Sequence, residues 1–245
     1  MPVLPRVREL HDEMRAWRRD LHAHPELGFE ERRTAALVAE RLRAFGLEVH
    51  EGVGRTGVVG VLRAGASGRS IGLRADMDAL PMREANAFAY RSTREGAMHA
   101  CGHDGHTAML LGAAKYLAET RAFDGAVRFI FQPAEEGLGG AQAMLADGLF
   151  ARFPCDALFG LHNRPGQPLG SFAVRAGPMM AGGAFFDIEI VGVGSHGARP
   201  QAGVDPVLAA AHVVAALQSV VSRNVPPVET AVVSVTRFHA GDAYN

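Results

Sequence analysis

Short apolar segments alternate with helical patterns along the N-terminal part of the chain, and this alternation restricts the fold most. Residues 5–45 have the spacing of two amphipathic helices, and residues 103–120 have the spacing of another. The apolar segments between them are typical of strands and lie at 47–50, 58–62, 71–73, 126–131 and 157–161. Strands separated by helices predict an α/β fold, with a mostly parallel sheet flanked by helices.

The pattern changes after a segment of small residues, AGPMMAGGA, which interrupts both periodicities. Residues 185–200 and 229–240 alternate like half-buried strands, and residues 205–223 between them form an alanine-rich helical pattern. The sequence therefore predicts two domains, which span residues 1–179 and 180–245, and the second is a smaller α+β domain.

Composition excludes several classes of partner. The chain has 245 residues, of which 48% are hydrophobic and 21% charged, and its formal net charge is −1. No basic surface is expected, so neither nucleic acid nor an anionic membrane is an expected partner. The N-terminus lacks the apolar segment of a signal peptide, and we expect no membrane-spanning segment. The two cysteines are too few for a disulfide framework. We expect a soluble, cytoplasmic protein.

Polar side chains follow several of the predicted strands. Asp76 and Asp78 follow the strand at 71–73, Glu135 and Glu136 follow the strand at 126–131, and His162 follows the last strand. Cys101 and His103, in the sequence MHACGHDGH, come just before a predicted helix. Ligands bind at the carboxyl ends of strands in open α/β sheets, so we expect these segments to meet in one crevice.

These residue types suit a metal centre. Thiolate, imidazole and carboxylate ligands are compatible with Zn²⁺ and also with Mn, Co or Ni. Of the adjacent Glu135 and Glu136, one can bind the ion while the other takes a proton from a water activated by the metal. The combination predicts metal-assisted hydrolysis of an amide, although a pair of glutamates alone is more often a solvated turn.

Two other interpretations explain less of the sequence. Cys101 near a helix N-terminus could be a thiolate nucleophile, but this leaves Glu135, Glu136 and His162 without a role. The segment GVGRTG at 52–57 matches a dinucleotide-binding pattern, which requires a helix directly after it. VVGVL follows instead, which is typical of a strand, so this interpretation is disfavoured.

The ordered motifs LHAHPELGFEE, LRADMDALPM, HACGHDGHTAMLLGAA, FQPAEEGLGGA, LHN and GSHGARPQAGVDP resemble the M20 metallopeptidase superfamily. The resemblance is to its amidohydrolase branch of hippurate and auxin-conjugate hydrolases, and it runs through the whole chain. It implies a zinc-exopeptidase-like catalytic domain that holds two divalent metal ions. It also implies an inserted lid domain through which the protein forms a homodimer.

The resemblance also implies roles for individual residues. Glu135 matches the general base, and His196 matches a lid histidine that binds the substrate carbonyl in the partner subunit's active site. Asp78 matches a residue that orients a ligand, whereas Asp76 and His106 receive no ligand role. The residues that match metal ligands are Cys101, His103, Glu136 and His162.

The implied reaction is the hydrolysis of N-acyl amino acids, such as N-benzoyl (hippurate-like), N-acetyl or indole-acyl conjugates. The family has a further ligand histidine near its C-terminus that nothing in this sequence matches. We therefore expect the chain to be truncated at its C-terminus within the lid domain, and its own activity to depend on the missing part. The alternative is a non-catalytic module for metal binding or dimerisation.

Overall fold

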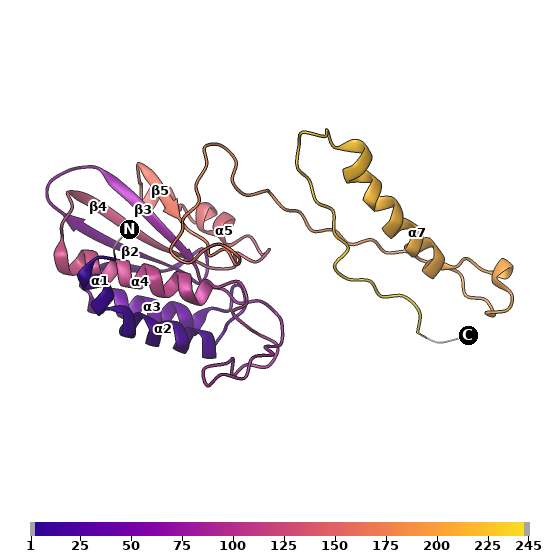
Figure 1. The fold of residues 1–245 in the computed structure, drawn as a ribbon, viewed down its shortest axis with the longest axis horizontal. Coiled ribbons are helices and arrows are strands. Elements are labelled where there is room, and N and C mark those ends of the chain that lie inside the picture. Colours follow the sequence, from indigo (N-terminus) through magenta and orange to yellow (C-terminus); the bar gives the residue numbers. More distant parts are fainter. Residues whose placement is uncertain (1–2, 243–245) are drawn as a thin grey trace. The chain divides into compact units, whose positions relative to one another are not determined.

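The computed structural model describes residues 3–242 of the chain (Figure 1). These residues belong to two structural units, Met1–Met179 and Met180–Asn245. The first unit contains a sheet with helices packed on it, and the second contains one long helix. The assignment of the two units as catalytic domain and lid stays a prediction.

Four helices of the first unit lie on one face of the sheet, as Figure 1 shows. They are α1 (Pro5–Glu9), α2 (His11–Ala23), α3 (Arg32–Ala44) and α4 (His103–Thr120). The buried side chains of α2, α3 and α4 share a core with Phe129 and Phe131 of the sheet, and this core includes Trp17, Val38 and Leu111. Burial of these apolar faces holds the helices on the sheet. Helix α4 has the predicted bounds, while residues 5–45 form three helices instead of two.

The sheet has five strands in the order β1-β2-β4-β3-β5. They are β1 (Glu48–Val53), β2 (Gly57–Ala64), β3 (Ser70–Asp76), β4 (Gly125–Gln132) and β5 (Ala157–Gly160). The α/β fold is confirmed, but the sheet is mixed instead of mostly parallel. Strand β3 is parallel to β4 and β5, whereas β2 is antiparallel to β1 and β4. The turn between β1 and β2 is short, and only antiparallel strands can be joined so briefly.

The register of the sheet places the ends of several strands together. Asp76, the last residue of β3, pairs with Gln132, the last residue of β4. Glu135 and Glu136 follow β4 closely, and His162 follows β5, which is parallel to β3. The carboxyl ends of these strands therefore bring the polar residues to one edge of the sheet.

A smaller core covers the opposite face of the sheet. Ile130 of β4 packs there with Val59 of β2 and with Met144 and Leu149. The last two belong to α5 (Gly140–Ala146) and α6 (Leu149–Arg152). Alternate side chains of β4 thus enter different cores, as the pleat of a strand requires.

The structure of the second unit differs from the structure that its sequence pattern predicts. Among its described residues lie helix α7 (Pro206–Ser219), the 3-10 turn η1 (Pro200–Ala202) and the π-helical turn η2 (Val220–Asn224). The strands predicted at 185–200 and 229–240 were wrong for these residues, which form only an isolated bridge between Val193 and Val204. An alternating segment becomes a strand only beside a partner that takes its hydrogen bonds.

One segment of the second unit has the length and composition of a membrane span, although the sequence analysis expects no membrane-spanning segment. Residues Pro206–Asn224 form a helical stretch with a mean hydropathy of 1.3, which is long and apolar enough to cross a membrane by length and composition only. A single helix of this kind is weak evidence, so the cytoplasmic location stays a prediction.

Gly140 lies where β4 passes into α5, and a side chain cannot fit there. A Cβ atom at Gly140 would lie 1.7 Å from the carbonyl oxygen of Pro133. We expect Gly140→Ala to lower the free energy of unfolding by about 1 to 3 kcal/mol, because the backbone before Glu135 must shift. Gly105 in α4 is the matched control, since a Cβ there meets no atom within 4 Å.

The Gly105→Ala variant should raise the free energy of unfolding by about 0.5 to 1 kcal/mol. Urea unfolding followed by the fluorescence of Trp17, the single tryptophan of the chain, measures both effects. Equal stability of the two variants would contradict the close approach at Gly140.

His99 makes the first unit sensitive to acid. Its side chain is buried, and neither ring nitrogen has a hydrogen-bond partner among the described residues. Burial lowers the pKa of His99 from 6.5 to about 4. As the pH falls, the unfolded chain therefore binds a proton at His99 before the folded chain does. The free energy of unfolding falls as the pH drops from 6.5 towards 4, and the contribution of this group is about 3 kcal/mol.

We expect His99→Leu to flatten the dependence of stability on pH in this window. The urea midpoint of the metal-free chain at pH 7 and at pH 5, compared with that of the unsubstituted chain, measures the effect. The same loss of stability in both proteins would show that other groups cause the acid sensitivity.

Candidate metal centre

His103, the first residue of α4, lies at the centre of the predicted site and is fully buried. Its Nδ1 lies 2.8 Å from the carbonyl oxygen of Asp78 and 3.3 Å from Oδ1 of the same residue. A carbonyl oxygen can only accept, so Nδ1 carries the proton and donates. In the neutral ring Nε2 then has a free lone pair, which is the state of a metal ligand.

The Nε2 atom of His103 faces carboxylates instead of a hydrogen-bond partner. It lies 3.7 Å from Oδ2 of Asp76, and 3.9 Å from both Oε2 of Glu135 and Oε1 of Glu136. Among the described residues it has no hydrogen-bond partner. Burial alone would lower the pKa of His103, but its bond to Asp78 and the charge of Asp76 outweigh burial and raise this pKa. The surroundings of Nε2 therefore favour a positive charge.

Asp78 connects three segments of the site. It follows β3, accepts from His103, and its Oδ2 accepts from the backbone N–H of Glu136 at 2.9 Å. Burial would raise the pKa of Asp78, but these hydrogen bonds lower it, so the carboxyl group is ionised at neutral pH. This arrangement supports the prediction that Asp78 orients a ligand instead of binding the metal itself.

The two glutamates come from a tight loop after β4. Ala134 has a φ of 48°, an unusual conformation for a residue other than glycine. Its N–H donates to Oε1 of the fully buried Glu31 at 2.7 Å, and Glu31 also accepts from Thr56. Glu31 thus holds the loop that carries Glu135. The side chain of Glu135 is 40% exposed, so it is open to a substrate.

Glu136 is more enclosed than Glu135. Its Oε1 is buried and has no hydrogen-bond partner among the described residues, like Nε2 of His103. Unpaired buried polar atoms are costly in a folded protein unless an ion or water satisfies them. Two such atoms 3.9 Å apart fit the positions of two ligands of one cation.

Cys101 and His162 complete one side of the site, with Sγ 3.3 Å from Nε2 of His162. Cys101, His103 and Glu136 form one cluster whose ligand atoms lie within 4.8 Å of one another. Burial, with the nearby Glu136 and Glu135, raises the pKa of the Cys101 thiol to about 12. A thiolate nucleophile needs a lowered pKa, so the structure disfavours that alternative, whereas a bound cation would stabilise the thiolate.

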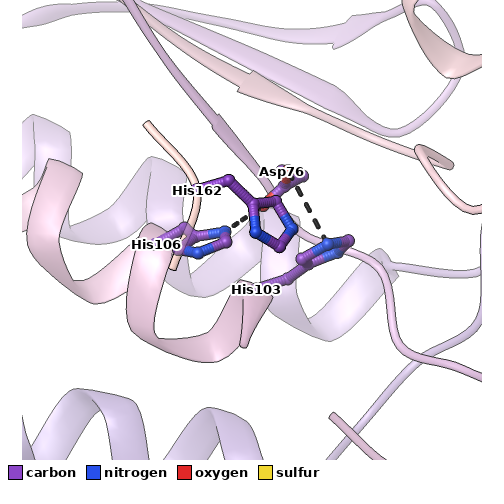
Figure 2. A group of neighbouring side chains, drawn as sticks. All are labelled: Asp76, His103, His106 and His162. Carbon is purple, nitrogen blue, oxygen red and sulfur yellow. Dashed lines mark hydrogen bonds and ion pairs between the residues drawn. The ribbon is translucent and has the colours of Figure 1, made fainter. Parts of the chain in front are cut away.

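A second cluster consists of Asp76, His103, His106 and His162, again with ligand atoms within 4.8 Å of one another (Figure 2). Asp76 and His106 received no ligand role in the sequence analysis, although the spacing of His103 and His106 places both on one face of α4.

Both nitrogens of His106 are already engaged. Nδ1 lies 2.6 Å from Oδ1 of Asp76, and a dashed line between these two residues marks the contact in Figure 2. Nε2 lies 2.7 Å from Oδ1 of Asn163. Burial would raise the pKa of Asp76, but the bond to His106 and the charge of Arg74 lower it to about 2. His106 therefore serves to hold the ionised Asp76, whose Oδ2 faces His103.

The structure thus brings together the predicted ligands, the predicted base and Asp78. Sulfur, nitrogen and oxygen donors surround a region of negative charge, and this donor set fits a divalent transition metal ion. His196 lies in the second unit, where its Nδ1 accepts from the N–H of Ala198 at 3.0 Å. Its role in substrate binding stays a prediction.

Comparisons with known proteins agree with this chemistry. The hippurate hydrolase of Campylobacter jejuni is 52% identical over all of this chain and 64% of its own length. An N-acyl-L-amino acid amidohydrolase of Geobacillus stearothermophilus is 46% identical over 98% of this chain and 65% of its own length. The chain therefore spans less than two thirds of these relatives.

Among solved structures, the YXEP protein of Bacillus subtilis is described as a dinuclear metal binding peptidase from the M20 family. It superposes with a TM-score of 0.71 at 36% identity and covers 97% of this chain, which spans 61% of it. The model of peptidase family M20/M25/M40 matches residues 72–242, from β3 to the second unit. The chain belongs to peptidase family M20/M25/M40.

Proposed function

We propose that the chain carries the metal centre of a metal-dependent amidohydrolase that cleaves N-acyl amino acids. The observation that carries this proposal is the buried Nε2 of His103, which has no partner among the described residues and faces Glu135 and Glu136. Cys101, His103, Glu136 and His162 would hold two divalent ions, and Asp76 is a further candidate ligand. Mn, Zn, Co and Ni all suit these donors.

When bound, the ions would lower the pKa of a water molecule towards about 7 and polarise the amide carbonyl. The protein's own groups do the remaining work. Glu135, on the open side of the site, takes a proton from the attacking water. The oxygen adds to the carbonyl carbon, the C–N bond breaks, and Glu135 gives the proton to the leaving amine. The products are a carboxylate and a free amino acid.

The names of two relatives support this substrate class, because both refer to N-acyl amino acids. N-benzoyl, N-acetyl and indole-acyl conjugates are the proposed substrates. We also propose that His196 binds the carbonyl oxygen of the scissile amide, that the second unit mediates homodimerisation, and that the protein is cytoplasmic.

Substitution of the proposed base separates catalysis from metal binding. We expect Glu135→Gln to reduce turnover of N-benzoylglycine by about 10² to 10⁴ while the bound metal is retained, because the amide cannot accept the proton. Glycine release and metal content of the same preparation are the measurements. Unchanged turnover would contradict the role of Glu135. If a protein that also contains the further C-terminal ligand histidine binds metal but hydrolyses none of the three conjugate classes, the non-catalytic metal-binding module would be favoured.

Substitution of two histidines of α4, one at a time, tests which imidazole nitrogen atoms bind the metal. His103→Gln should weaken binding of Zn²⁺ by at least about 100-fold, because it removes the atom shared by both clusters. His106→Gln should weaken it by about tenfold, the lower end of the range of about 10- to 100-fold for a residue that only supports a ligand. Titration calorimetry with Zn²⁺ measures both. Equal losses would show that His106 is itself a ligand.

A further inference from the structure

We propose that His22, Asp104 and Glu84 form a buried clamp that positions Cys101 and His103 in the metal centre. The three residues come from α2, from the first turn of α4 and from the loop after β3. This inference rests on the proposed function, since it assigns positioning residues to the same site. None of the three belongs to the two clusters of candidate ligands.

His22 bridges two buried carboxylates. Its Nδ1 lies 2.8 Å from Oδ2 of Asp104, and its Nε2 lies 3.0 Å from Oε1 of Glu84. The side chains of all three residues are at most 4% exposed. An ionised carboxylate can only accept, so both ring nitrogens donate and His22 is the imidazolium cation. The positive imidazolium lies between two negative carboxylates and attracts both of them.

The charges around the clamp are balanced. Arg18 Nε donates to Oδ2 of Asp104 at 2.9 Å, so two cations meet two carboxylates. Burial would lower the pKa of His22, but its bond to Asp104, which acts more strongly, and its bond to Glu84 raise it. Removal of one partner would leave an unpaired charge in the interior, which a folded protein tolerates poorly.

Glu84 connects the clamp to other residues of the long loop between β3 and α4. It accepts from the N–H of Ser92 and from Asn86, and the side chain of Ser92 donates to the carbonyl oxygen of Ala97 at 2.8 Å. Thr93 donates to Ala23 at the end of α2. The rings of Phe88 and Tyr90 stack on each other at 4.2 Å and pack edge-on against His22. The loop is therefore folded around the imidazolium.

The C-terminal end of this loop leads directly to the predicted metal ligands Cys101 and His103. Met98 exchanges two backbone hydrogen bonds with Leu80, which closes the base of the loop. Cys101 and His103 follow within a few residues, and Asp104 is the next residue of α4. The clamp thus fixes the segment 98–104 at both ends, through Glu84 on the loop side and through Asp104 on the helix side.

The same two helices offer a matched control. Helices α2 and α4 are also joined by an ion pair between Glu13 and Lys115, with Oε2 and Nζ 2.5 Å apart. This pair lies several turns from His103 along α4. Lys115→Met should remove an interhelical ion pair without affecting the segment 98–104.

The first experiment is hydrogen exchange of the metal-free 245-residue chain. In Glu84→Ala and His22→Gln, amides of residues 98–102 should exchange at least about tenfold faster than in the unsubstituted chain, while Lys115→Met should exchange at the unsubstituted rate. Far-UV circular dichroism shows which variants fold. If His22→Gln fails to fold, Glu84→Ala decides, because it leaves the pairs of Asp104 with His22 and Arg18 in place.

The second experiment uses Co²⁺, whose near-UV charge-transfer band reports a bond to the Cys101 thiolate. Glu84→Ala should weaken Co²⁺ binding by about 10- to 100-fold and reduce the band at saturation. Exchange rates and Co²⁺ affinities like those of the unsubstituted chain in a folded Glu84→Ala variant would overturn the proposal.

The two proposals fail in distinguishable ways. No Co²⁺ binding by the unsubstituted chain, or a band that survives in Cys101→Ser, would contradict the proposed metal centre. Hydrogen exchange would still decide whether the clamp positions the segment 98–104, because that measurement needs no metal.

Discussion

The hydrogen bond from Nδ1 of His103 to the backbone oxygen of Asp78 is the interaction on which the site depends. It fixes the proton on one nitrogen of a fully buried ring and leaves the other nitrogen directed at Glu135, Glu136 and Asp76. Metal-binding histidines generally have such a partner on their second nitrogen. Because Asp78 also holds the backbone of Glu136, one residue aligns an imidazole and a carboxylate that come from different parts of the sequence.

The sheet makes this alignment possible. Strands β3, β4 and β5 all run in the same direction, opposite to that of β2, because β4 pairs antiparallel with β2 and β3 pairs parallel with both β4 and β5. Their carboxyl ends meet at one edge, and the loops that follow carry Asp78, Glu136 and His162. Buried charges then hold these loops. Glu31 binds the backbone before Glu135, and His22 bridges the loop after β3 to α4. The structure therefore supports the centre with polar groups that are themselves buried and paired.

The sequence predicted those features that depend on local periodicity. Helix α4 has its predicted bounds, and each predicted strand of the first unit exists, because these patterns are local. The meeting of Asp78, Glu136 and His162 followed from their places after strands. The insertion of β4 between β2 and β3, the support of Ala134 by Glu31 and the pairing of His106 with Asp76 are contacts between distant segments, and no local pattern predicts them. In the second unit the local pattern was present but was not enough. Its segments alternate like strands, yet they form no strand because no pairing strand lies beside them among the described residues.

Anomalous X-ray diffraction from crystals of the chain grown with Zn²⁺ tests the central claim most directly, because it locates the ion relative to named atoms. The account predicts an anomalous peak about 2.0 to 2.1 Å from Nε2 of His103, the usual bond length to zinc, with Nδ1 still bonded to Asp78. A peak bound elsewhere, with Nε2 of His103 left without the ion, would contradict the account.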